Sequence, residues 1–129
     1  MSFETRWLRD GVLLCRWPSV IDNGALEESI RGHDALLRDH IPRPYWAVHE
    51  ASGGFPIVTA GQRRVIGEWL GREQTRTHRS IRGALVVTPS PLLRGMVTAV
   101  RWVANPRYEW KTFATRDEAL AFIDAYVAP

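Results

Sequence analysis

The chain has 129 residues, of which 45% are hydrophobic and 24% charged, and its net charge is +3. This length and composition predict a single folded domain over residues 1–129, which can bury roughly two-thirds of the surface of its unfolded chain. The one cysteine, Cys15, excludes an internal disulfide and a zinc site made of cysteines. No apolar run approaches the roughly 20 residues that cross a bilayer, so we expect no membrane insertion.

The basic residues are almost all arginine, with Lys111 as the one lysine. Together with many Ala, Gly and Pro residues, this composition indicates a GC-rich bacterial genome. The other interpretation is that arginine was selected because it makes bidentate contacts with carboxylates and phosphates. The N-terminal segment contains acidic residues and lacks the apolar stretch of a signal peptide, so we expect a cytoplasmic protein.

The first predicted element is a β-hairpin over residues 1–17. Asp10 and Gly11 are a strong signal for a two-residue hairpin turn, because both tolerate a positive φ. Pro18 ends the returning strand, since proline has no amide hydrogen for a sheet. Cys15 lies in this strand, and we expect it to be a small core residue rather than an exposed thiol.

Helices and apolar strands alternate in the middle of the chain. We expect helices at residues 24–39, 60–70 and about 91–104, and strands at residues 45–49 and 84–88. Asp22 or Asn23 can cap the first helix, and Thr59 can cap the second. Gly71 is a plausible end for the second helix. The polar residues 72–81 predict a surface loop or a frayed helical tail.

The third helix has an apolar stripe that we expect to face the interior. Its members are Leu92, Leu93, Met96, Val97, Val100 and Val103. Trp102 lies one residue beyond this stripe, and we expect it to be exposed.

The chain ends with a strand at residues 108–113 followed by an amphipathic helix. Thr115 and Glu118 have the spacing of a capping box, in which each side chain satisfies a free amide at the helix start. The full element order is β-β-α-β-α-β-α-β-α. Strands separated by single helices predict parallel neighbours joined by right-handed crossovers. The predicted fold class is therefore α/β, with a mixed sheet of about five strands and four helices.

This order, together with the segment from Phe113 to Ile123 (FATRDEALAFI), resembles the STAS-domain superfamily. That superfamily includes the anti-sigma factor antagonists and a looser group of STAS-like proteins. The resemblance covers nearly the whole chain. It implies a single-domain STAS-like sandwich and a regulatory role through protein–protein docking.

The regulatory members of the superfamily are phosphorylated on a Ser or Thr at the start of the helix after the third strand. The matching region here is residues 57–62 (IVTAGQ), in which Gly61 is kept and the usual acceptor position falls nearest Ala60. Thr59 carries the one hydroxyl group in this segment, and no Asp precedes it. Thr59 is then either a helix cap or a phosphorylation switch, because the start of a helix also favours phosphate.

The loop after the strand at 45–49 is a candidate anion-binding turn, with a plain turn as the alternative. Its residues are Ser52, Gly53, Gly54, Thr59 and Gly61. His49, Glu50 and Ser52 do not form a recognisable hydrolase motif, since no G-x-S-x-G elbow is present and adjacent strand residues point to opposite faces. The four histidines lack metal-ligand spacing. We therefore expect no enzymatic activity, no cofactor and no metal.

Basic residues cluster between positions 63 and 82, and we interpret them as a docking patch for an acidic partner or as a solvated surface. They are Arg63, Arg64, Arg72, Arg76, Arg79 and Arg82. Nucleic acid is not an expected partner, because the chain shows neither stacking platforms nor a groove-reading motif. An exposed Trp102 close to arginines would be a typical hot spot for protein contacts.

The sequence therefore predicts a non-enzymatic cytoplasmic module that docks a protein through the loops at 51–61 and 89–92 and the adjoining arginines. A charge change at Thr59 or Ser52 would switch the interaction. The alternative is a binder of a small or lipid-like molecule, with a pocket between sheet and helices lined by Trp and Leu. We also expect a homodimer formed through a surface that carries Trp.

Overall fold

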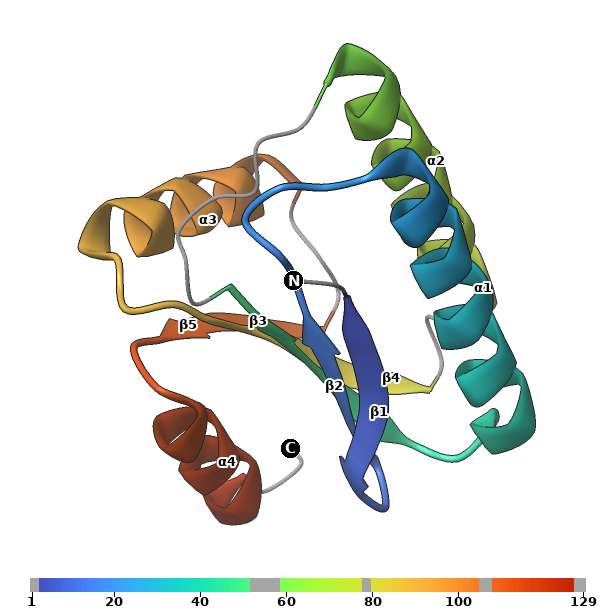
Figure 1. The fold of residues 1–129 in the computed structure, drawn as a ribbon. Helices are drawn as coiled ribbons and strands as arrows, with labels where there is room; N and C mark the ends of the chain where they lie inside the picture. The colour runs from blue at the N-terminus through green and yellow to red at the C-terminus, as the bar shows by residue number, and fades with distance from the viewer. Residues whose placement is uncertain (1–2, 52–58, 78–79, 105–107, 127–129) are drawn as a thin grey trace.

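Five strands form one sheet that has helices on both sides (Figure 1). The computed structural model describes residues 3–51, 59–77, 80–104 and 108–126, without the side chains of residues 70, 74–77, 100, 101, 103 and 104. The elements are β1 (Glu4–Arg9), β2 (Val12–Arg16), α1 (Asn23–His40), β3 (Tyr45–Glu50), α2 (Ala60–Thr77), β4 (Ile81–Val87), α3 (Pro91–Ala104), β5 (Glu109–Phe113) and α4 (Arg116–Ala125). The predicted α/β class and element order are confirmed.

The strands lie side by side in chain order, β1-β2-β3-β4-β5. β1 and β2 are antiparallel around Gly11, whose φ of 79° favours glycine. β2, β3, β4 and β5 are parallel, so their carboxyl ends lie at one edge of the sheet. Right-handed crossovers in a steadily advancing order bring α1, α2 and α3 to one side of the sheet. Helix α4 covers the other side (Figure 1).

The central strands bury both of their faces. On β3, Trp46 and Val48 face the core under α4, whereas Tyr45 and Ala47 face the core under α1. The ring of Trp46 meets that of Tyr126 edge to face at a centroid distance of 4.9 Å. This alternation matches the nearly continuous apolar runs that buried parallel strands require.

Cys15 faces the core under α1, as expected of a small core residue. Its burial, with a smaller contribution from the charge of Glu73, raises the pKa of the thiol to about 12. Because the thiolate is the reactive form, this cysteine is chemically inert at neutral pH.

The predicted caps of α1 and α4 are confirmed. The carboxylate of Asp22 accepts a hydrogen bond from the amide of Ala25 at 3.2 Å, at the start of α1. The hydroxyl of Thr115 accepts one from the amide of Glu118 at 3.2 Å, at the start of α4. Each bond satisfies one of the amides that lack a partner in a helical first turn.

Two predicted boundaries are wrong. Helix α2 continues through Gly71 to Thr77, because Trp69 and Glu73 are both buried, one turn apart, and packing continues past the glycine. The helical-tail interpretation of residues 72–81 is therefore correct up to Thr77. Strand β4 begins at Ile81 rather than Ala84, because Tyr45 of β3 pairs with Ile81.

The predicted orientation of α3 is wrong in part. Leu93 is buried and Val97 half-buried, as expected, but Leu92 is 77% exposed and Met96 49% exposed. The helix packs mainly against β5, at one margin of the sheet. A helix at a margin has protein on one side only, so half of a broad apolar stripe remains outside.

Gly83 allows a close approach between three strands. A Cβ atom at this position would lie 2.5 Å from Cζ3 of Trp46 and 2.8 Å from the carbonyl oxygen of Glu109.

We predict that Gly83→Ala lowers the free energy of unfolding by about 1–3 kcal/mol, because the crowded core must shift. Gly32→Ala is the control, since a Cβ there meets nothing within 4 Å. It should stabilise α1 by about 0.5–1 kcal/mol. Urea unfolding measures both values, and equal stabilities for the two variants would contradict this packing.

Candidate functional site

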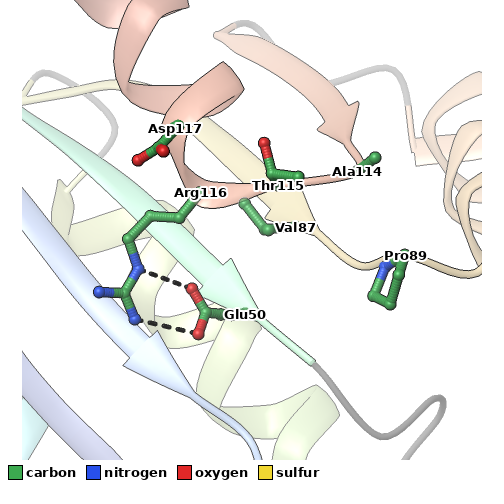
Figure 2. A pocket seen from close by; sticks show the side chains of 7 residues that line it. All are labelled: Glu50, Val87, Pro89, Ala114, Thr115, Arg116 and Asp117. Atoms are coloured by element: carbon green, nitrogen blue, oxygen red, sulfur yellow. Dashed lines mark hydrogen bonds and ion pairs between the residues drawn. The ribbon is translucent and has the colours of Figure 1, made fainter.

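A hollow of about 410 Å³ lies where β3, β4 and β5 end and α4 begins (Figure 2). Its lining residues are Glu50, Val87, Pro89, Ala114, Thr115, Arg116 and Asp117. In open parallel sheets, ligands bind at the carboxyl ends of strands, so this is the expected place for a site. The lining is charged and small, unlike the Trp and Leu pocket that the ligand-binding alternative predicts.

A bidentate ion pair between Glu50 and Arg116 spans the hollow. Nε and Nη2 of Arg116 donate to the two carboxylate oxygens at 2.8 and 3.0 Å, as Figure 2 shows. The Glu50 side chain is 13% exposed, so the pair is shielded from most of the solvent. The hydrogen bond to Glu50 raises the pKa of Arg116. The pair ties the start of α4 to the end of β3.

The ion pair continues into β2 and β1. Nε of Arg16 lies 3.3 Å from Glu50, and Nη1 of Arg16 lies 3.4 Å from Glu4. Glu4 also binds Arg6, and the hydrogen bond from Arg6 is the largest cause that lowers the pKa of the Glu4 carboxyl. Opposite charges therefore alternate from β1 to α4 along this edge of the sheet.

His49 lies beside this network at the end of β3. The indole Nε1 of Trp17 donates to Nδ1 of His49 at 3.1 Å. Loss of hydration on burial lowers the pKa of the imidazole to about 4. His49 is therefore neutral at neutral pH, and its Nδ1 is engaged as an acceptor. The histidine acts as a hydrogen-bond acceptor that holds Trp17 in place.

Glu50 and Arg116, which line the hollow, are directed toward each other. Both oxygens of Glu50 accept from the guanidinium of Arg116, which directs the carboxylate toward α4. The arrangement favours a structural role for the charges, and leaves the rim of the hollow as a surface that another molecule can meet.

Thr59 caps α2, as the first of the two interpretations of this residue predicts. Its hydroxyl accepts from the amide of Gln62 at 3.1 Å, and its amide donates to Oε1 of Gln62 at 3.0 Å. Nε2 of the same glutamine donates to the carbonyl of Ile21 and to Oδ1 of Asn23, which joins the starts of α2 and α1. This role of Gln62 was not predicted, although T-x-x-Q has the spacing of a capping box. Gly61 is exposed.

The remaining members of the candidate turn, Ser52, Gly53 and Gly54, lie outside the described residues. An anion-binding role for them, and a phosphorylation switch at Ser52 or Thr59, stay predictions. The hydroxyl of Thr59 is on an exposed residue even though it serves as a cap.

The described arginines of the predicted docking patch do not share one face. Arg63, Arg64 and Arg72 are exposed on α2, and Arg82 is exposed on β4. Arg63 and Arg72 are nine residues apart, which at roughly 100° per residue places them on opposite sides of α2. The side chain of Arg76 and all of Arg79 lie outside the described part of the chain. A role for this group in docking stays a prediction.

Three of the four large hydrophobic side chains that are exposed on the described residues lie on the outer face of α3. Large side chains stand out from it, with Trp102 81% exposed, Leu92 77% and Met96 49%. Among the described side chains of α3 the exposed ones are Pro91, Leu92, Gly95, Met96, Thr98, Ala99 and Trp102, and none of these is charged. We call these seven residues the outer α3 face. The exposure expected for Trp102 is confirmed.

One cluster of metal-binding side chain types joins α1 to α2. Ligand atoms of His33, Asp34 and Glu73 all lie within 4.8 Å of one another. Nε1 of Trp69 donates to Asp34 at 3.3 Å, and its ring meets that of His33 edge to face. Each of the three also takes part in further interactions of the fold. Spacing along the sequence did not indicate the cluster, because its members come from two helices.

One solved structure is similar to this chain over most of its length. It is the crystal structure of an uncharacterized protein of the DUF3478 family from Shewanella loihica PV-4, described as having a SpoIIAA-like fold. The two match over 94% of this chain and 91% of the other, with a TM-score of 0.65 and 14% identity. This protein has a SpoIIAA-like fold. The predicted resemblance to the STAS superfamily is thus confirmed for the fold.

No family model matches the sequence, and no curated protein is similar to it. Within the described residues, the helices lack the combined length and apolar character of a membrane span.

The Glu50–Arg116 pair should contribute measurably to stability. We predict that Arg116→Met lowers the free energy of unfolding by about 1–3 kcal/mol, because it leaves a largely buried carboxylate with poorer partners. Arg9→Met is the matched control, since Arg9 also binds a carboxylate of α4, Asp124, but with side chains that are 46% and 63% exposed. Its effect should stay below about 1 kcal/mol. Equal losses in urea unfolding would contradict the structural role of the shielded pair.

His49 should make stability depend on pH in a defined window. The folded-state pKa of about 4 lies below the ordinary value of 6.5, so the unfolded chain binds the proton more readily. Neutral His49 therefore makes its full contribution to the free energy of unfolding above about pH 6.5. This contribution is lost as the pH falls toward 4. We predict that wild type loses up to about 3 kcal/mol more than His49→Asn between these limits, since Asn accepts from Trp17 without titrating. Urea unfolding at several pH values would show parallel curves if the prediction is wrong.

Proposed function

We propose that this protein is a non-enzymatic regulatory module of the bacterial cytoplasm that binds another protein through the outer α3 face. The observation that carries the proposal is the exposure of Leu92, Met96 and Trp102 on a helix face without a described charge. Large contiguous apolar surface in contact with water is uncommon on a monomer and typically marks an interaction site. Tryptophan is also the side chain most enriched among residues that dominate binding energy.

The location of this face supports the same proposal. The turn before α3 starts at the carboxyl end of β4, where the amide of Ser90 donates to Thr88 and the hydroxyl of Ser90 accepts from Leu93. Nη1 of Arg94 donates to the carbonyl of Thr88 at 2.8 Å, which anchors the first turn of the helix. The outer α3 face, which begins at Pro91, is thus held by a hydrogen-bonded turn. Rigid presentation reduces the entropy lost on binding.

The alternative function, binding of a small ligand, has one observation in its favour. The hollow beside Glu50 has a volume of about 410 Å³, which lies in the usual range of ligand pockets. Its internal ion pair makes this the weaker candidate, because a ligand would have to compete with Arg116 for the carboxylate. Native mass spectrometry of the purified chain would reveal a bound molecule as added mass.

Docking through the outer α3 face is tested by affinity capture from the native host, with the bound proteins quantified by mass spectrometry. We predict that Trp102→Ala reduces recovery of the partner at least about tenfold, as loss of a hot spot does. Val20→Ser is the matched control, because Val20 is an apolar residue that is 69% exposed but lies outside α3. Its partner recovery should equal that of wild type. A partner retained by Trp102→Ala and by Leu92→Ser would contradict docking at this face.

A further inference from the structure

The outer α3 face has an internal symmetry that suits contact with itself. Six of its seven members pair off at equal distances from position 97, with Leu92 matching Trp102, Gly95 matching Ala99 and Met96 matching Thr98. Leu92 and Trp102 therefore stand at the two ends, the small residues Gly95 and Ala99 lie near the middle, and Met96 and Thr98 lie at the two borders of the face. Two antiparallel copies of such a helix can bring their backbones close at the small residues while the large ends cover each other.

The charge distribution also favours a copy of the same chain. The chain carries a net charge of +3, so two copies repel each other mildly as a whole. The described exposed side chains of α3 carry no charge. Arg94 of the same helix is half-buried and donates to the carbonyl of Thr88. The outer α3 face is thus a place where two basic chains meet without opposing like charges.

We propose that the occupant of the outer α3 face is a second copy of this chain, bound in a two-fold symmetric, antiparallel contact centred between Gly95 and Ala99. A two-fold axis at this position sets Leu92 level with Trp102 of the second copy, and Gly95 level with its Ala99. Such a contact is self-complementary and closes after two chains, so it forms a dimer and not a fibre. This inference rests on the proposed function and names the partner of the same site.

The size of the face sets the strength of the dimer. Helix α3 has 14 residues, which makes it about 21 Å long. Figure 1 shows it at the margin of the molecule, apart from α1 and α2, so it can approach another molecule. A single helix face of this length is smaller than the roughly 800 Å² per partner of a standard stable interface. The dimer is therefore reversible and depends on concentration.

Sedimentation velocity over a range of protein concentrations tests the proposal. Wild type should shift from monomer to dimer as the concentration rises toward about 1 mM. Ala99→Arg places two like charges near the dimer axis and should weaken association at least tenfold. Val20→Arg adds the same charge at an exposed apolar site elsewhere and should associate as wild type does. Circular dichroism and thermal unfolding establish that both variants are folded.

Disulfide trapping tests the register. A mixture of Gly95→Cys and Ala99→Cys chains should form the mixed disulfide in preference to either self-linked product, because these two positions lie level across the axis. Cys15 does not interfere, since it is buried. Trapping without this preference, or a dimer that Ala99→Arg leaves intact, overturns the antiparallel contact.

The outcomes separate this inference from the docking function. A chain that stays monomeric to about 1 mM, while Trp102→Ala abolishes capture of a different protein, overturns the second-copy assignment and leaves docking at α3 standing. A chain whose self-association and captured proteins are both insensitive to changes on the outer α3 face overturns both proposals.

Discussion

Burial of the central strands on both faces is the constraint on which this fold depends. Neighbouring residues of β2 and β3 serve two separate cores, so each strand needs a helix on either side. The crossover helices cover only the side to which right-handed connections bring them. The other side is covered by α4, whose Ala119 is fully buried. The rings of Phe122 in this helix and of Tyr126 just after it pack around Trp46.

The position of α4 explains the ion pair at the carboxyl edge. A helix that follows the last strand must start where the parallel strands end, and this start brings Arg116 next to Glu50. Charges placed there are shielded by the strand ends, so they bind each other more strongly than surface pairs do. At this edge, where ligands bind in many α/β proteins, the Glu50–Arg116 pair attaches α4 to β3.

Helix α3 has an exposed apolar face because it lies at the margin of the sheet. It packs against β5, the last strand, and its far side faces solvent. Leu93 is buried against the rest of the protein, whereas Leu92, one position earlier in the chain, is exposed to solvent. An apolar face that intramolecular packing leaves open is available for intermolecular packing, and its lack of described charges suits another protein surface.

The sequence by itself determined the local elements. The turn at Asp10 and Gly11, the caps at Asp22 and Thr115, and the apolar strand at 45–49 were predictable because a few adjacent residues carry each signal. The tertiary structure alone decided that α2 continues past Gly71, that Arg116 meets Glu50 across 66 positions, and that Leu92 and Met96 lie outside. Periodicity shows that a helix has an apolar side, but where a stripe is broad, the neighbouring strand decides which part of it becomes core and which part remains surface.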